Sequence, residues 1–202
     1  MTSAEMFDDE PVSMRVTRSF AFLDLCGFTD FVDVHGDEAA VEELAVLRAN
    51  IRAVASRCGI RIDKWLGDGV MLVGVEPQPL IEAVMAIEAR TAGHSRLPLR
   101  AGLASGPVII LEGDDYVGSA VNLAARLCDR ARAHQVLASA ELADDLPAGV
   151  KGKPMAGMRV RGFVKPVEVV SLSQEGDAEP SLIETGGAAI ASLFDALVRR
   201  SG

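Results

Sequence analysis

Short apolar runs alternate with amphipathic segments along most of this chain, and their order limits the fold more than any other feature. One strand-like run is followed by a helical segment, a pair of runs, a second helix, a second pair, a third helix and further runs. One face of the first helical segment is apolar, formed by Leu44, Leu47, Ile51 and Val54. This order predicts an α+β fold in which a mostly antiparallel sheet carries helices on its faces.

The limits of the expected elements follow from the same patterns. We expect helices at 37–58, 78–92 and 119–131, and strands at 18–25, 60–66, 69–75, 97–106, 107–113, 134–139, 158–163 and 166–172. Residues 140–157 mix helix-forming and loop residues. These elements give one domain at 18–173, preceded by a flexible lead-in at 1–17 and followed at 174–202 by a polar linker and a C-terminal amphipathic helix.

Composition narrows the class of protein. The 202 residues are 49% hydrophobic and 24% charged, which suits one well-buried core. The net charge of -9, without a run of Lys or Arg, argues against nucleic acid as a partner. Three widely spaced cysteines fit free thiols in a reducing compartment, and no apolar stretch reaches the roughly 20 residues that cross a bilayer. We therefore expect a cytoplasmic domain with no transmembrane segment in this chain.

Two carboxylates are notable for their positions in the expected strands. Asp24 interrupts the apolar run Phe-Leu-Asp-Leu, where an unpaired carboxylate is costly. Asp68 lies between Gly67 and Gly69, in the turn of an expected hairpin. Each also has an ordinary interpretation, as a helix cap for Asp24 and as a turn residue for Asp68. If the two strands are neighbours, both carboxylates reach one small volume, where a divalent cation relieves their repulsion.

The chain leaves its first strand through a short turn that enters a helix. Backbone amides at such a strand-to-helix turn can hold phosphate oxygens, and Gly27 permits a close approach. The pattern GxxxxGK[ST] is absent, so the turn is not a Walker motif. Taken alone, the turn indicates an anion site of unspecified kind.

Three motifs, FLDLCGFT, KWLGDGVM and DDYVGSAVNLAARL, occur in this order and resemble the class III adenylyl/guanylyl cyclase homology domain. The similarity runs from about Arg18 to Leu172, which is nearly the whole chain apart from its ends. The resemblance implies a ferredoxin-like, palm-like α+β domain that binds two divalent metal ions, Mg²⁺ or Mn²⁺. It also implies the conversion of ATP to 3′,5′-cyclic AMP and pyrophosphate.

The resemblance assigns roles to individual positions. Asp24 and Asp68 match the metal-binding aspartates, with Leu25 in the same set, and Asp24 is the nearest candidate for a base. The implied substrate contacts are Cys26, Gly27, Phe28 and Thr29 at the phosphates, Lys64 and Asp115 at the adenine, Asn122 at the ribose, Arg126 at the α-phosphate, and Arg161, or alternatively Lys165, at the terminal phosphates.

The chemistry of Lys64 and Asp115 favours ATP over GTP. Adenine presents an acceptor at N1 and a donor at its exocyclic amine, which a Lys donor and an Asp acceptor complement. Guanine presents the reverse pattern, and a mismatched buried polar pair costs on the order of several kcal/mol. Asn122 and Arg126 are four residues apart in an expected helix, so one helical face can reach both ribose and α-phosphate.

In the resembled family, the active site lies between two catalytic domains packed head to tail. One domain supplies the metal aspartates, and the other supplies the Lys, Asp, Asn and Arg residues. This chain contains both sets, so the resemblance implies a homodimer with two equivalent sites. The alternatives are a guanylyl cyclase, a catalytically silent nucleotide-binding regulatory module, and a polymerase-like or diguanylate-type palm domain. The palm alternative is disfavoured by the acidic net charge and by the absence of a GG[DE]EF-like turn.

Overall fold

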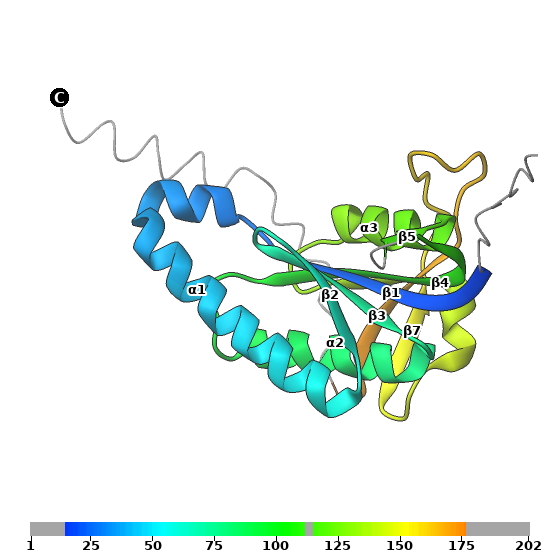
Figure 1. Ribbon diagram of the computed structural model, residues 1–202, viewed down its shortest axis with the longest axis horizontal. Coiled ribbons are helices and arrows are strands. Elements are labelled where there is room, and N and C mark those ends of the chain that lie inside the picture. The colour runs from blue at the N-terminus through cyan, green and yellow to red at the C-terminus, as the bar shows by residue number, and fades with distance from the viewer. Residues whose placement is uncertain (1–14, 112–114, 177–202) are drawn as a thin grey trace, which may run out of the picture.

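A computed structural model of the chain describes residues 15–111 and 115–176, which form one mixed sheet covered by helices (Figure 1). The elements are β1 (Arg15–Leu25), α1 (Phe28–Cys58), β2 (Arg61–Leu66), β3 (Gly69–Gly74), α2 (Pro77–Ala92), β4 (Leu99–Leu111), β5 (Asp115–Val117), α3 (Ser119–Arg130), β6 (Val136–Ser139), the 3₁₀ helix η1 (Ala140–Asp145), β7 (Val150–Pro154) and β8 (Val169–Gln174).

The strand order across the sheet is β2-β3-β1-β4-β6-β8-β7, with β5 paired to β4. Among the described strand pairs, only β4 and β6 run parallel. The predicted α+β fold with a mostly antiparallel sheet is therefore confirmed. β1 is a central strand, and each of its residues from Arg15 to Leu25 faces a residue of β4.

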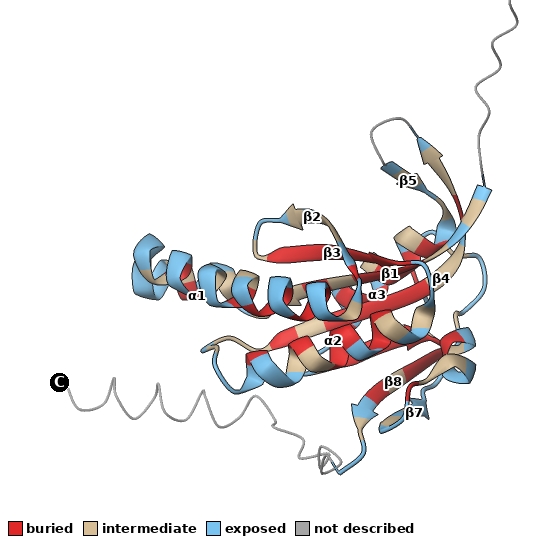
Figure 2. Ribbon diagram, turned by 60° about the horizontal axis from the view of Figure 1, so that its bottom comes forward, coloured by how far each residue is buried: buried red, intermediate tan, exposed pale blue. Residues whose placement is uncertain are grey.

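Alternating side chains divide the core into two layers, one on each face of the sheet. In β1, Ala21 and Leu23 pack with α1 and α2, whereas Phe20 packs with α3. Leu47 and Ile51 of α1 are buried in the first layer, as the predicted apolar face requires. Figure 2 shows the buried strands enclosed between these helices.

α3 lies very close to β4 because residue 102 is a glycine. A Cβ on Gly102 would come 2.1 Å from the backbone N of Cys128 and 2.3 Å from the backbone O of Ala124. Any side chain at this position would push α3 away from the sheet. The close contact fixes the helix that carries Asn122 and Arg126.

α1 begins nine residues earlier than predicted and contains a break. It starts at Phe28 rather than at residue 37, and Gly36 has φ 82° and ψ 169°, which is not helical. The apolar periodicity after residue 37 therefore identified only the longer part of the helix, which carries most of its buried residues. The helix ends at Gly59, whose φ of 67° is the left-handed cap expected of a glycine.

Three predicted elements differ from the structure. The strands expected at 97–106 and 107–113 form one strand, β4. Pro107 is tolerated inside this strand because it lies between the stretch that pairs with β6 and the stretch that pairs with β5. On that edge of β4, residue 107 has no described strand partner that would need an N–H donor. The strand expected at 158–163 is wrong, since Gly162 has φ 93° and only the single bridge between Met158 and Val167 forms. β7 lies within 140–157, where no strand was expected.

The ends of the described domain differ slightly from those expected. β1 begins at Arg15, so residues 15–17 pair with β4 and are not part of a lead-in. β8 extends to Gln174, one residue beyond the expected end. The predicted C-terminal amphipathic helix lies outside the described residues. Among the helices described, none combines the length and the apolar character needed to cross a membrane.

Candidate active site

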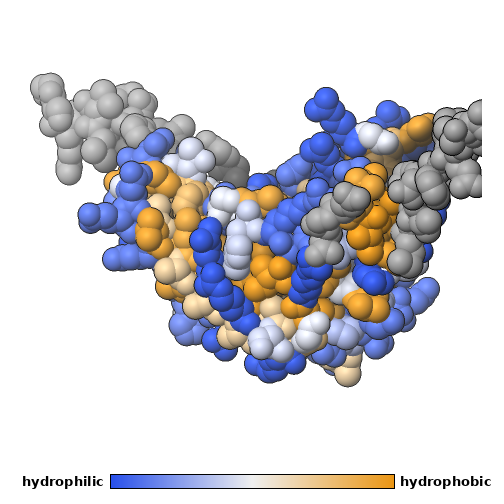
Figure 3. All heavy atoms as spheres, in the orientation of Figure 1, coloured by the Kyte–Doolittle hydropathy of each residue, from blue (hydrophilic) through white to orange (hydrophobic). Residues whose placement is uncertain are grey.

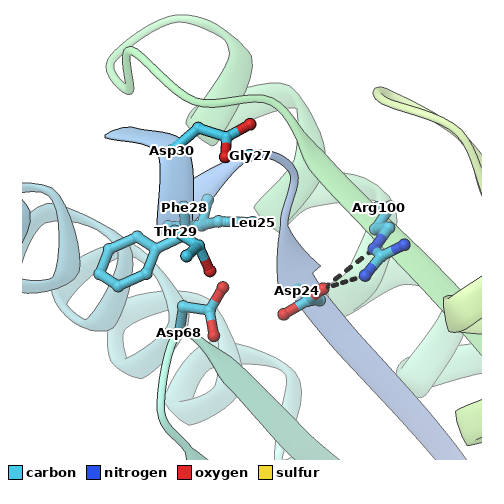
Figure 4. Close-up of a pocket in the computed structure, with 8 residues that line it drawn as sticks. All are labelled: Asp24, Leu25, Gly27, Phe28, Thr29, Asp30, Asp68 and Arg100. Carbon is cyan, nitrogen blue, oxygen red and sulfur yellow. Dashed lines mark hydrogen bonds and ion pairs between the residues drawn. The ribbon is translucent and has the colours of Figure 1, made fainter. Parts of the chain in front are cut away.

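Asp24 and Asp68 line one pocket of about 320 Å³ at the end of β1 (Figure 4). β1 and β3 are antiparallel neighbours, with Leu23 opposite Val70, and Asp68 occupies the two-residue turn just before β3. The carboxylates thus reach the same space, as the sequence predicted. Gly69 makes room for them, because a Cβ there would lie 3.3 Å from Oδ1 of Asp24.

The first turn of α1 forms the opposite wall of this pocket. The helix and its N-cap contribute Gly27, Phe28, Thr29 and Asp30 to the lining, and Leu25 adds the end of β1. Gly27 is the N-cap, with φ 77°, and the described structure shows no side-chain hydrogen bond that caps the helix. The first-turn amides of a helix have no intrahelical acceptor, so this end of α1 can bind an anion.

Arg100, which sequence reasoning missed, also lines the pocket. Its Nη2 and Nε donate to Oδ2 of Asp24 at 2.5 and 2.9 Å, as the dashed lines in Figure 4 show. The hydrogen bond to Asp24 raises the pKa of Arg100 further. Arg100 is the Cα partner of Asp24 across β1 and β4, so the sheet register places the two side chains together.

The electrostatics of the pocket suit a bound cation. Burial raises the pKa of Asp68, the nearby charge of Asp24 raises it further, and Arg100 opposes this effect. Asp24 on β1 and Asp68 in the β2–β3 turn therefore share one counter-charge, the guanidinium of Arg100, whose described hydrogen bonds go to Asp24. The described residues hold no group of three or more His, Cys, Asp or Glu side chains that would ligate a metal by themselves. A divalent ion here would complete its shell with backbone, water or phosphate oxygens.

Lys64 and Asp115 form an ion pair and hydrogen bond, although they are 51 residues apart in the sequence. Lys64 lies on β2 and Asp115 begins β5. Both side chains are exposed, at 45% and 57% of their surface, and the hydrogen bond to Asp115 raises the pKa of Lys64. The structure thus brings together the two residues predicted to read the base.

Asn122 and Arg126 lie on the exposed side of α3, one turn apart. Arg126 donates to Asp129 at 3.1 Å. Arg161 and Lys165 are exposed in the segment between β7 and β8. None of these four residues, and neither member of the Lys64–Asp115 pair, belongs to the described lining of the Asp24–Asp68 pocket. In one chain, the residues predicted to bind the nucleoside therefore lie outside the described pocket that holds the two aspartates.

Cys26 is not part of the described lining of the pocket. Its backbone N–H donates to the carbonyl of Pro98 at 2.8 Å, so a contact with the phosphates would not use this amide and stays a prediction. Burial raises the pKa of the Cys26 thiol, and the neighbouring Arg100 lowers it.

Comparisons with known proteins decide the family. No family model matches the chain. An uncharacterised protein of Mycobacterium tuberculosis is 36% identical over 164 residues, which cover 79% of this chain and 42% of that protein. A pH-sensitive adenylate cyclase of the same species is 36% identical over 131 residues, covering 63% of this chain and 31% of that protein. An adenylate cyclase of Streptomyces coelicolor is 31% identical over 140 residues, covering 69% and 36%.

Solved structures agree in fold. The adenylyl cyclase CyaB from P. aeruginosa superposes with a TM-score of 0.72 at 24% identity, covering 80% of this chain and 96% of that chain. The guanylate cyclase domain of RhGC from Catenaria anguillulae, in complex with GTP, gives 0.69 at 20% identity, covering 80% and 99%. The described residues form a class III nucleotide cyclase homology domain.

The cyclase homology domain accounts for most of this chain but for a smaller part of its relatives. The chain spans less than half the length of each of the three relatives named above. Within the domain, Asp24 and Asp68 meet in the pocket, and Lys64 meets Asp115. Arg100 has a signal in the sequence, since a charged residue within the apolar run around β4 requires a buried partner, as Asp24 does in β1.

Proposed function

We propose that this domain converts ATP to 3′,5′-cyclic AMP and pyrophosphate at sites shared by two copies of the chain. The observation that carries the proposal is the paired Lys64 and Asp115, which present a donor and an acceptor side by side. This pattern complements the N1 and exocyclic amine of adenine. The names of the M. tuberculosis and S. coelicolor relatives support the same substrate.

The chain's own residues supply binding and charge. The Lys64 ammonium donates to adenine N1, and the Asp115 carboxylate accepts from the amine. Asn122 orients the ribose, and Arg126 balances the charge that grows on the α-phosphate as the ribose 3′-oxygen attacks it. The free amides at the start of α1 hold phosphate oxygens beside Thr29. Arg161, or alternatively Lys165, contacts the terminal phosphates.

Asp24 and Asp68 would hold two divalent cations, Mg²⁺ or Mn²⁺, with Leu25 as a further contact. The pKa of Asp68, which burial and the charge of Asp24 raise, supports this fit because it reflects an excess of negative charge in the pocket. When bound, such cations lower the pKa of the ribose hydroxyl and neutralise phosphate charge. Arg100 lies beside Asp24 in the same pocket, where its guanidinium also suits a phosphate oxygen.

A second copy of the chain is needed because the pocket with the two aspartates has none of the residues expected to bind the nucleoside in its described lining. Exposed apolar side chains accompany the base-reading pair: Leu66 lies two residues from Lys64, and Val117 lies two residues from Asp115. Figure 3 shows hydrophobic side chains gathered between hydrophilic ones on one face of the molecule. A partner packed head to tail would cover such side chains and bring its aspartates to the nucleotide. We place this homodimer in the cytoplasm, where ATP is available.

The direct test is product analysis with equal concentrations of ATP and GTP, and with Mg²⁺ or Mn²⁺. We expect cyclic AMP as the main product, and no product from Asp24→Ala or Arg126→Ala protein. Predominance of cyclic GMP would contradict the interpretation of Lys64 and Asp115. If no cyclic nucleotide forms although ATP binds, the domain is the silent regulatory module instead.

A further inference from the structure

α1 consists of two helical parts that meet at Gly36. The backbone of Gly36, with φ 82° and ψ 169°, separates residues 28–35 from residues 37–58. A Cβ on Gly36 would have no atom within 4 Å, so the backbone conformation, rather than a lack of space, requires glycine there. The angle between the two parts is therefore not fixed by continuous helical geometry.

The two parts differ in how they are held. The long part is anchored in the core by Leu47, Ile51 and other buried residues. The short part carries Phe28 and Thr29 into the pocket, and Phe31 is its buried apolar residue. Phe28 packs at the edge of the same core, so contacts that cross the break at Gly36 act together with this packing to set the position of the pocket wall.

Arg96 makes such contacts on both sides of the break. It lies in the connection between α2 and β4. Its guanidinium is 5.7 Å from the centre of the Phe31 ring, in the short part of α1. Its Nε is 3.1 Å from Oε1 of Glu43 and its Nη2 is 3.6 Å from Oε2 of Glu42, both in the long part.

Glu43 gives this contact a rigid base. Its side chain is only 6% exposed, which is unusual for a carboxylate. Its Oε2 also accepts from the hydroxyl of Ser95 at 2.8 Å and from the backbone N–H of Arg96 at 3.2 Å. A buried carboxylate with this many donors holds one geometry, so the backbone at Arg96 is fixed relative to the long part of α1.

We propose that Arg96 is a positioning residue, which sets the angle of the short part of α1 and thereby places Phe28 and Thr29 in the pocket. The inference rests on the proposed function for its effect on the reaction. Its structural part, the restraint of residues 28–35, stands independently. Arg96 does not belong to the described lining of the pocket, so its effect on substrate is indirect.

The test compares Arg96→Ala, Arg96→Lys and a control, Arg57→Ala, which removes an exposed arginine from the far end of α1. In Arg96→Ala we expect amide hydrogen exchange in residues 28–35 to become about tenfold faster, because a local restraint is lost. We expect the KM for ATP to rise about fivefold while the melting temperature changes little, because the substrate groups are misplaced. Arg96→Lys, which keeps the cation, should restore part of both properties.

Unchanged exchange in residues 28–35 of the Arg96→Ala protein would overturn the proposal. Faster exchange without a change in KM would overturn its catalytic part, and equal effects in Arg57→Ala would show that the effect is not specific to Arg96. If the unaltered chain forms no cyclic nucleotide, the proposed function fails, whereas the exchange experiment still decides whether Arg96 restrains α1.

Discussion

The Asp24–Asp68 pocket and the Lys64–Asp115 pair differ in how far the single chain completes them. In the pocket, Asp24 is already held by Arg100, and both carboxylates are partly buried beside the first turn of α1. Lys64 and Asp115 are about half exposed and are held by each other. One region is a partly buried charge network, and the other is an open surface that displays hydrogen-bonding groups.

This difference indicates what each region lacks in a single chain. The pocket has an excess of negative charge, which cations can balance. The open surface offers matched groups to a base but has no described wall that would exclude water from them. A second copy that brings its pocket to this surface would supply both the wall and the cations. Variants in each region can test this division.

The largest effect is expected from complementation between the two regions. Asp24→Ala and Arg126→Ala should each lose nearly all cyclase activity, because each damages both sites of a homodimer. Mixed in equal amounts, they should recover about a quarter of the unaltered activity, since half of the dimers are mixed and each mixed dimer has one intact site. Cyclic AMP formation measures the recovery.

The control for complementation is a mixture of Asp24→Ala with Asp68→Ala. Both substitutions lie in the same half of the site, so this mixture should remain inactive. Equal recovery in both mixtures would contradict a site divided between chains.

A smaller, selective effect is expected at the open surface. Lys64→Glu combined with Asp115→Cys should lower kcat/KM for ATP by about 100-fold, because the adenine edge loses its donor and acceptor. The ratio of kcat/KM for GTP to that for ATP should rise. Lys151→Gln, which removes one positive charge from an exposed lysine on β7, matches the net change of charge in the double variant. An unchanged ratio would show that this pair does not read the base.

In the pocket, Arg100→Ala should have opposite effects on cation binding and on turnover. Removing the guanidinium frees Asp24, so Mn²⁺ should bind about fivefold more tightly in the absence of nucleotide. Activity should fall, because the more negative pocket repels the triphosphate. Titration calorimetry measures the first effect, and Arg100→Lys is the matched variant that keeps the charge. Weaker Mn²⁺ binding would contradict competition between Arg100 and the cation for Asp24.

The smallest effect concerns Cys128, which lies on the buried face of α3 and is 4% exposed. Burial raises the pKa of this thiol from 9.0 to about 12. The folded chain therefore keeps the thiol proton to a higher pH than the unfolded chain, and the free energy of unfolding should fall as the pH rises above about 9. At pH 8, iodoacetamide should modify Cys128 only after denaturation, as mass spectrometry can detect. Rapid modification of the native protein would contradict this burial.

The sequence predicts those parts of the fold and of the site that are encoded by a few adjacent residues. The hairpin with Asp68 in its turn is encoded by two strand-like runs and a Gly-Asp-Gly sequence, and the helix cap at Gly59 by a glycine after a periodic segment. The family motifs indicated that Lys64 and Asp115 act together. The contact itself could not be deduced from periodicity, because it joins residues separated by 51 positions.

The missed features depend on tertiary structure. The pairing of Asp24 with Arg100 follows from the register of β1 against β4, which no local pattern specifies. The break at Gly36 falls in a segment whose residues are compatible with a helix on either side. Residues 158–163 alternate like a strand, yet the turn at Gly162 and the hydrogen bond from the Phe163 N–H to the Val160 carbonyl prevent it from forming.

The central position of β1 has a consequence for how the pocket would accommodate ions of different radius. Asp24 belongs to a strand that is paired on both sides, whereas Asp68 occupies a two-residue turn at the end of the outer hairpin. Strands in the middle of a sheet open least readily, and turn tips move most. When a larger ion replaces a smaller one, Asp24 would therefore act as the fixed ligand, and the turn at Asp68 would make the adjustment.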